Sequence, residues 1–377
     1  MKKALQLVAW DDPRCTAPIA AAQRAWACKS GIEIEVSVRS LEAFNDQPLR
    51  ELAPHCDLMV VDYPHVARAI SESAIVSFDE LLGAEAVRPI ADRAIGNAQV
   101  SFVVDGAHAA LACDAACHLS ASRPVKFTEL GCGAPSTWQD IFTLADSNPG
   151  TVAVALSPTD AISILLSLAH GAGTEPDGGS RLFRNARAAR LCAATLARLA
   201  STVPEYCWHS SPQDIFRIAE EFDEISYIPL TFGYSRKVRR EEGGWRFLPP
   251  PEGCGSLLGG AGMAISSLTK HGQEAAEFAL WFCGREGQVL AAQNLGQPSN
   301  LAAWDNPGTD SEMACFFQDA RAIQETAFVR PLASWWPSAQ VELGTTLVEE
   351  IRGNSDLERI IEALESVYRR HREESET

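Results

Sequence analysis

Leu58-Met-Val-Val-Asp-Tyr-Pro-His65 is the stretch of this sequence that decides the fold. Its apolar start, with two β-branched residues, is typical of a buried strand, and the polar and aromatic residues that follow mark the end of that strand. Residues 8–14, Val-Ala-Trp-Asp-Asp-Pro-Arg, repeat the arrangement at the end of an earlier apolar run. In open α/β sheets, ligands bind just beyond the carboxyl ends of such strands. We therefore expect both strand ends to line one cleft for a small polar ligand.

The segments around these two stretches predict a β-α-β-α-β order. Apolar periodicity and stop signals predict strands at 4–10, 32–38 and 57–62, and helices at 18–30 and 40–52. This order favours a parallel sheet with right-handed crossovers. Further along, two short apolar runs flank Asp105-Gly106, which predicts a hairpin turn.

Composition bounds the class of protein. A chain of 377 residues is too long for one ordinary core and favours two lobes. With 46% hydrophobic and 21% charged residues, the chain is typical of a globular protein. A net charge of −17 leaves no basic stripe, so we expect neither nucleic acid nor an anionic membrane as a partner.

The N-terminus and the cysteines indicate in which cellular compartment the protein is expected. Met1-Lys2-Lys3 precedes an apolar run that is too short for an export segment. The eleven cysteines are scattered singly, a pattern typical of reduced, buried thiols. We therefore expect a cytoplasmic protein, or a periplasmic one if the sequence is a trimmed mature form. Cys113-x3-Cys117-His118 and His55-Cys56 lack a second pair at zinc-ligand spacing, so no metal site is expected. No cofactor is expected either, because the glycines at 259, 260 and 262 do not form a dinucleotide fingerprint.

Seven short motifs occur in the order and spacing of one known family. They are Trp10-Asp-Asp-Pro-Arg14, Val61-Asp-Tyr-Pro-His65, Leu156-Ser-Pro-Thr-Asp-Ala161, Phe232-Gly-Tyr-Ser235, Leu258-Gly-Gly-Ala-Gly262, Gly296-Gln-Pro298 and Arg330-Pro331. On these motifs the chain resembles the family 1 extracellular solute-binding proteins, the substrate-binding components of ABC importers, and within them a branch lacking a signal peptide. The match spans nearly the whole chain.

The resemblance implies a two-lobed α/β protein of the type II periplasmic-binding fold, with a ligand cleft between the lobes. It places lobe one at 1–112 plus 255–305, lobe two at 113–254, and C-terminal helices that bridge the lobes at 306–377. The chain departs from the family pattern at Asp12, where a histidine is usual, and after Gln297 and Arg330-Pro331. Because these departures change the chemistry of the pocket, the ligand of a relative is not carried over.

Twelve residues are candidates for ligand contact. They are Trp10, Asp11, Asp12, Arg14, Asp62, His65, Trp138, Asp160, Tyr234, Gly260, Gln297 and Arg330. The tryptophans could stack on a sugar ring or pack in the core. Arg14 and Arg330 are suited to an anionic group, with a salt bridge as the alternative. Ligand contact is favoured for Asp62, and helix capping for Asp160. The glycine permits close approach of the backbone, while Tyr234 and Gln297 offer a hydroxyl and an amide.

Two classes of function remain open from the sequence. Binding of a sugar, a sugar acid or a small carboxylate ranks first, because no nucleophile-plus-base motif is visible. The alternative is a cytosolic lyase, hydrolase or isomerase of a small acid, with Asp62 and His65 as catalytic candidates. For His65, a structural role is favoured over that of a general base. An ABC transporter permease is a partner only if the protein is exported, and the oligomeric state stays open.

Overall fold

Residues 58–62 form a central strand of the computed structural model, which describes residues 4–376. The strands are β1 (Ala4–Trp10), β2 (Glu33–Arg39), β3 (Leu58–Asp62), β4 (Ile75–Val76), β5 (Val103–Val104), β6 (Ala107–His108), β7 (Leu111–Ser122), β8 (Tyr227–Phe232), β9 (Arg246–Leu248) and β10 (Leu258–Ser266). The main sheet has the order β2-β1-β3-β10-β7-β8. Because β1 pairs in parallel with both β2 and β3, the predicted parallel arrangement is confirmed.

Both faces of β3 are buried. Leu58 and Val60 belong to one hydrophobic cluster, and Met59 and Val61 to another that extends into the second lobe. A strand buried on both faces needs apolar residues at consecutive positions, which is the reason for the uninterrupted apolar run. The edge strand β2 instead buries only Ile34 and Arg39, and its other positions are exposed or half-buried.

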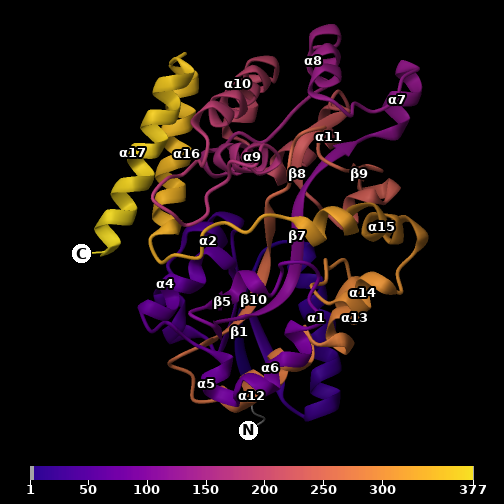
Figure 1. Ribbon diagram of the computed structural model, residues 1–377. Helices are drawn as coiled ribbons and strands as arrows, with labels where there is room; N and C mark the ends of the chain where they lie inside the picture. Colours follow the sequence, from indigo (N-terminus) through magenta and orange to yellow (C-terminus); the bar gives the residue numbers. More distant parts are fainter. Residues whose placement is uncertain (1–3, 377) are drawn as a thin grey trace.

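The helices divide between two lobes that are set one above the other in Figure 1. Lobe one carries α1 (Pro13–Ser30), α2 (Leu41–Asp46), α3 (Leu49–Leu52), α4 (Val66–Ser71), α5 (Phe78–Leu82), α6 (Ala84–Ala91), α12 (Gly272–Cys283), α13 (Arg285–Gln293) and α14 (Leu301–Asp305). Lobe two carries α7 (Pro124–Leu130), α8 (Trp138–Ser147), α9 (Pro158–Gly171), α10 (Ala186–Thr202), α11 (Pro212–Phe222), α15 (Ser311–Thr326), α16 (Trp336–Arg352) and α17 (Leu357–Glu376). Among residues 4–376, no helix is both long and apolar enough to span a membrane.

One strand runs through both lobes. The first half of β7 pairs with β10, and its second half pairs with β8 and β9. All twelve residues of β7 are buried. The expected boundary between residues 112 and 113 therefore falls within a strand that the two lobes share.

Helix α1 begins five residues earlier than the sequence predicted. Asp12 is its N-cap, with the side chain accepting a hydrogen bond from the Arg14 backbone N–H, and Pro13 occupies the first turn. Proline is well tolerated there, because the first helical N–H groups have no intrahelical acceptor. The predicted hairpin is confirmed, since β5 pairs antiparallel with β6 across Asp105 and Gly106, both at positive φ.

The C-terminal helices pack mainly on lobe two. Helix α16 packs along α9, and α17 packs on α16 and α10, as Figure 1 shows at its left side. Lobe one is reached from this group at the start of α16, where the Arg68 guanidinium donates a hydrogen bond to the Ser338 hydroxyl. The group thus extends lobe two and places its first turn at the edge of the space between the lobes.

Candidate functional site

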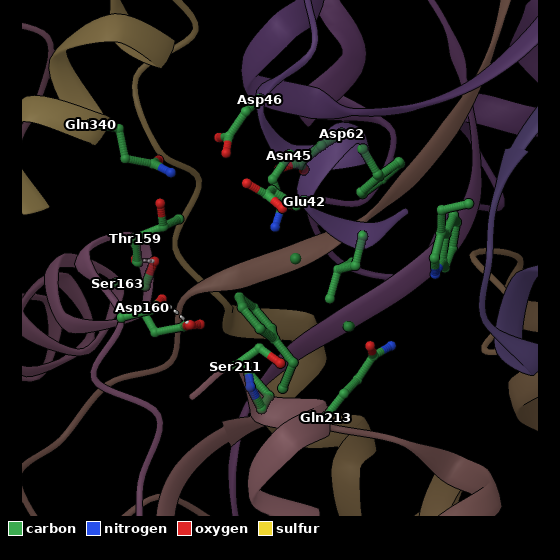
Figure 2. Close-up of a pocket in the computed structure, with 18 of the residues that line it drawn as sticks. Glu42, Asn45, Asp46, Asp62, Thr159, Asp160, Ser163, Ser211, Gln213 and Gln340 are labelled. Carbon is green, nitrogen blue, oxygen red and sulfur yellow. Dashed lines mark hydrogen bonds between the residues drawn. The ribbon is translucent and has the colours of Figure 1, made fainter. Parts of the chain in front are cut away.

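A cavity of about 690 Å³ lies between the two lobes. From lobe one, it is lined by the ends of β1 and β3, by helix α2 and by the glycines at the start of β10. From lobe two, it is lined by the first turns of α9 and α11, by the segment after β8 and by α16. Figure 2 shows Glu42, Asn45 and Asp46 of α2 facing Thr159 and Asp160 of α9 across this open space. We call this cavity the interlobe cleft.

The same four-residue motif begins both lobe-two helices of the cleft. Ser157-Pro-Thr-Asp160 starts α9 and Ser211-Pro-Gln-Asp214 starts α11. In α11 the motif forms a capping box, in which each of Ser211 and Asp214 bonds the other's backbone N–H. In α9 the Ser157 hydroxyl instead donates to Asp160 Oδ2 at 2.6 Å. Both motifs place short polar side chains at the cleft wall, so this repeat is the sequence signal that could have located it.

Aromatic side chains supply flat apolar surfaces in the cleft. Trp10 packs against Phe44 with 4.8 Å between ring centroids, and both residues line the cavity with Phe232 and Tyr234. Tyr234 is 7% exposed, and its burial raises the pKa of the phenol. No hydrogen bond joins its hydroxyl to another residue of the described chain, and the ring lies against Phe216. Apolar faces beside hydrogen-bonding groups match the two kinds of surface of a sugar.

Arg14 lines the cleft, but its charge is neutralised. Its guanidinium makes two hydrogen bonds to the Asp114 carboxylate, one of them from Nε to Oδ2 at 2.8 Å, and Nη1 donates to the Gly233 carbonyl at 3.2 Å. Both members of the pair are buried. Burial is the largest single effect and would lower the pKa of Arg14, but the attraction and hydrogen bonds of Asp114, together with Tyr234 and Asp12, raise it. This arginine therefore holds the lobes together at the cleft floor, as an ion pair.

The Arg330 guanidinium is likewise engaged in hydrogen bonds and an ion pair within the chain. Its Nε donates to the Tyr63 hydroxyl at 2.7 Å, Nη1 donates to Gln340 Oε1 at 3.0 Å, and Nη2 lies 3.4 Å from Asp62 Oδ1. The guanidinium also lies over the Tyr63 ring, 4.4 Å from its centroid. Since each cleft arginine already faces a carboxylate, the geometry does not supply the anion site that the sequence predicted.

Asp62 lines the cleft, while His65 lines a neighbouring cavity of about 100 Å³. The His65 Nε2 lies 2.5 Å from the Asn45 carbonyl oxygen, and burial lowers the pKa of the imidazole. A neutral ring whose Nε2–H bonds a carbonyl holds α2 against the segment after β3. This placement agrees with the structural role favoured for His65.

Besides His65, four more of the predicted contacts lie outside the residues that line the interlobe cleft, which corrects their expected placement. Asp11 is exposed at the end of β1. Asp12 is the α1 N-cap, and its second oxygen accepts a hydrogen bond from Gln213 Nε2 at 2.7 Å, across the lobes. Trp138 packs on Phe142 one turn along α8. Gln297 is buried, where its oxygen accepts from the Ser235 backbone N–H and its amide donates to the Ala115 carbonyl.

Gly260 lies in the cleft wall for a conformational reason. Its φ is +124°, and a Cβ there would come within 2.3 Å of the Asp114 carbonyl oxygen. Only glycine fits this contact between β10 and β7. Trp10, Arg14, Asp62, Asp160, Tyr234 and Arg330 also line the cleft, so seven of the twelve candidates share one cavity.

Several cleft residues were not predicted from the sequence. They are Glu42, Asn45, Asp46, Thr159, Ser163, Ser211, Gln213, Asp214, Gln340 and Thr345. Including Asp62, Asp114 and Asp160, six carboxylates line the cleft against two arginines. After the two ion pairs are formed, the wall keeps an excess of negative charge. Among residues 4–376, no three side chains converge as a metal site.

Comparison with known proteins shows the fold. No family model and no curated protein sequence matches the chain. Among solved structures, maltose-bound MalE3 of T. maritima matches with a TM-score of 0.81 at 14% identity, covering 97% of this chain and 98% of its own. An ABC transporter solute-binding protein of Thermotoga lettingae, bound with α-D-tagatose, matches with a TM-score of 0.82 at 15% identity, covering 98% and 99%. One from Agrobacterium radiobacter, in complex with ribitol, matches with 0.79 at 14%, covering 98% of each chain. The chain thus has the two-lobed fold of the ABC transporter solute-binding proteins, as the resemblance implied.

Proposed function

We propose that this protein is a solute-binding protein that closes over a small polyhydroxy ligand, a sugar or polyol. The observation that carries the proposal is the interlobe cleft, where aromatic faces and short hydrogen-bonding side chains from both lobes line one cavity of about 690 Å³. Ligand pockets of this size bury most of a small molecule's surface. The fold neighbours described as bound to maltose, tagatose and ribitol support the same class of ligand.

Contacts between the lobes support closure around the ligand. Gln213 of α11 bonds Asp12 of lobe one, and Arg14 of α1 bonds the Gly233 carbonyl after β8. A ligand held by α2 on one side and by α9 on the other adds to these contacts only when the lobes are together. Its binding free energy therefore favours the closed arrangement.

The site chemistry favours a sugar over a sugar acid or a small carboxylate. Both cleft arginines are paired, and the remaining charges of the wall are mostly carboxylates. A carboxylate ligand would be repelled there, whereas hydroxyl groups can donate hydrogen bonds to the acidic side chains. The enzyme alternative receives no support from the geometry, because His65 is engaged with Asn45 and Asp62 with Arg330.

A reducing compartment, the cytoplasm, remains part of the proposal. What supports it is the cysteine inventory, in which eleven thiols are free and most are buried. Disulfides form and persist in oxidising compartments. Fractionation of the native host, with immunodetection of this protein, tests the location. A periplasmic signal would instead favour a role beside an ABC transporter permease.

Isothermal titration with maltose, D-tagatose, ribitol and D-glucuronate tests the proposed function. We expect binding of at least one neutral compound and none of the glucuronate. Trp10→Phe should weaken that binding, because the larger indole face lines the cleft, whereas Trp138→Phe, at a site outside the cleft, should leave it unchanged. Binding of the glucuronate without binding of any neutral sugar or polyol, or equal losses in both variants, would overturn the proposal.

A further inference from the structure

We infer that the ligand of the interlobe cleft carries a positively charged amino group beside its hydroxyls, as in an amino sugar or an aminated polyol. This inference rests on the proposed function and narrows its class of ligand. It follows from the distribution of charge in the cleft and from the hydroxyl of Tyr234, which no residue of the described chain engages.

Three carboxylates of the cleft wall have no lysine or arginine partner within the described chain. Asp62 and Asp114 are paired with the two arginines, and Asp214 Oδ1 lies 3.5 Å from Nη2 of Arg217 on the same helix. For Glu42, Asp46 and Asp160, no lysine or arginine of residues 4–376 lies within ion-pair distance. Figure 2 shows these three side chains arranged around the same open space, two from α2 and one from α9.

The carboxylates are held where their charge is unfavourable without a counterion. The pKa of Asp160 is raised to about 6, mainly by burial and to a smaller extent by the charge of Asp214. Burial also raises the pKa of Asp46; His65 offsets part of this increase, and the charge of Glu42 adds to it. An ionised carboxylate with raised pKa gains more from a nearby cation than one in water does. A cation bound between α2 and α9 would relieve this repulsion and draw the lobes together.

Tyr234 is an independent sign of a ligand at the same place. Its side chain is more than nine-tenths buried and lines the cleft, yet its hydroxyl has no hydrogen-bond partner in the described chain. Because the residue lines the cavity, this hydroxyl is available to bond a ligand there. Asp160 lines the same cavity, and its charge is one of the causes that raise the pKa of the Tyr234 phenol, after the larger effects of burial and Asp12. An ammonium group could donate to both the phenol oxygen and the carboxylate.

A bound metal ion is a poorer explanation of the charge. Among residues 4–376, no three histidine, cysteine or acidic side chains converge at metal-ligand distances. The acidic groups lie on opposite lobes around a cavity large enough for a small organic molecule. A cation carried on a hydroxylated ligand fits both the spacing of the charges and the aromatic surfaces between them.

The test compares matched ligands that are similar in shape and differ in charge. D-Glucosamine is compared with D-glucose and with N-acetyl-D-glucosamine, and 1-amino-1-deoxy-D-sorbitol with D-sorbitol, by isothermal titration of the full chain at pH 6.8. At low salt we expect each amine to bind at least tenfold more tightly than its neutral counterparts. The margin should shrink at 300 mM salt, because part of the attraction is screened.

Variants then locate the charge. Asp160→Asn should remove most of the preference for the amine, and Tyr234→Phe should reduce it several-fold. Asp146→Asn is the matched control, since it removes one exposed carboxylate of lobe two that does not line the cleft. Neutral ligands that bind as tightly as the amines would overturn the inference and leave the proposed function intact. If neither amines nor neutral sugars and polyols bind, the proposed function fails together with the inference.

Discussion

Replacing Asp160 by asparagine should stabilise the protein in the absence of ligand. Burial raises the pKa of this carboxyl from 3.8 to about 6, so its ionised form is destabilised in the folded state. A shift of about two units corresponds to about 3 kcal/mol. Water in the cleft screens part of this penalty, and loss of a negative charge in the first turn of α9 costs about 0.5 kcal/mol. We therefore expect a net gain of about 1–2 kcal/mol at pH 7.5.

The gain must depend on pH in a defined direction. Below pH 3.8 the carboxyl is protonated in both the folded and the unfolded state, so the penalty is absent. As pH rises from 3.8 to about 6, the unfolded chain releases its proton first, and the stability of the wild type falls relative to the variant. The Ser157 hydroxyl, which donates to Asp160 Oδ2, can donate equally to the asparagine oxygen. The local geometry of α9 should therefore persist.

Urea unfolding followed by tryptophan fluorescence, without sugar, measures the difference. The transition midpoint of Asp160→Asn should exceed that of the wild type at pH 7.5 and approach it at pH 4. Asp146→Asn, on the exposed side of α8, should show neither effect. A variant that is less stable than the wild type at pH 7.5, or equally stabilised at both pH values, would refute the reasoning.

Two further outcomes follow from buried groups. Asp114→Asn leaves the Arg14 guanidinium buried without its carboxylate and should lower the free energy of unfolding by about 3–5 kcal/mol in the same assay; a loss below 1 kcal/mol would contradict the ion pair. At pH 7.5, Ellman's reagent should modify three of the eleven thiols within minutes and the others only in urea, because burial raises the pKa of thiols such as Cys117, to about 12. The three reactive thiols are the exposed Cys28, Cys132 and Cys315. Rapid modification of more than four thiols would contradict this expectation.

The sequence determined the local architecture and much of the strand-end chemistry. The apolar run 58–61 could only be a strand covered on both faces, and the following Asp62 had to leave that strand at its carboxyl end. Asp105-Gly106 determined a tight turn for the same local reason, because the two residues tolerate positive φ. Such features depend on neighbouring residues along the chain, which the sequence displays directly.

Other features of the site depended on contacts between distant residues. The Asp12-Pro13 pair marks a helix N-terminus, a local signal that could have been recognised, but the bond from Gln213 to Asp12 joins positions 201 residues apart. The acidic wall of α2 carried no motif, because its residues are ordinary for a short exposed helix. Only the packing of α9 opposite α2 makes them part of a cleft.

The charge of the cleft was decided by tertiary structure alone. Arg14 and Arg330 were expected to attract an anion, but each is neutralised by a carboxylate, 100 residues away in one case and 268 in the other. A sequence shows which charged groups exist, whereas their mutual distances determine which charges cancel. Electrostatic attraction falls with distance and strengthens on burial, so the fold converts two apparent anion sites into ion pairs and leaves the acidic groups to face the ligand.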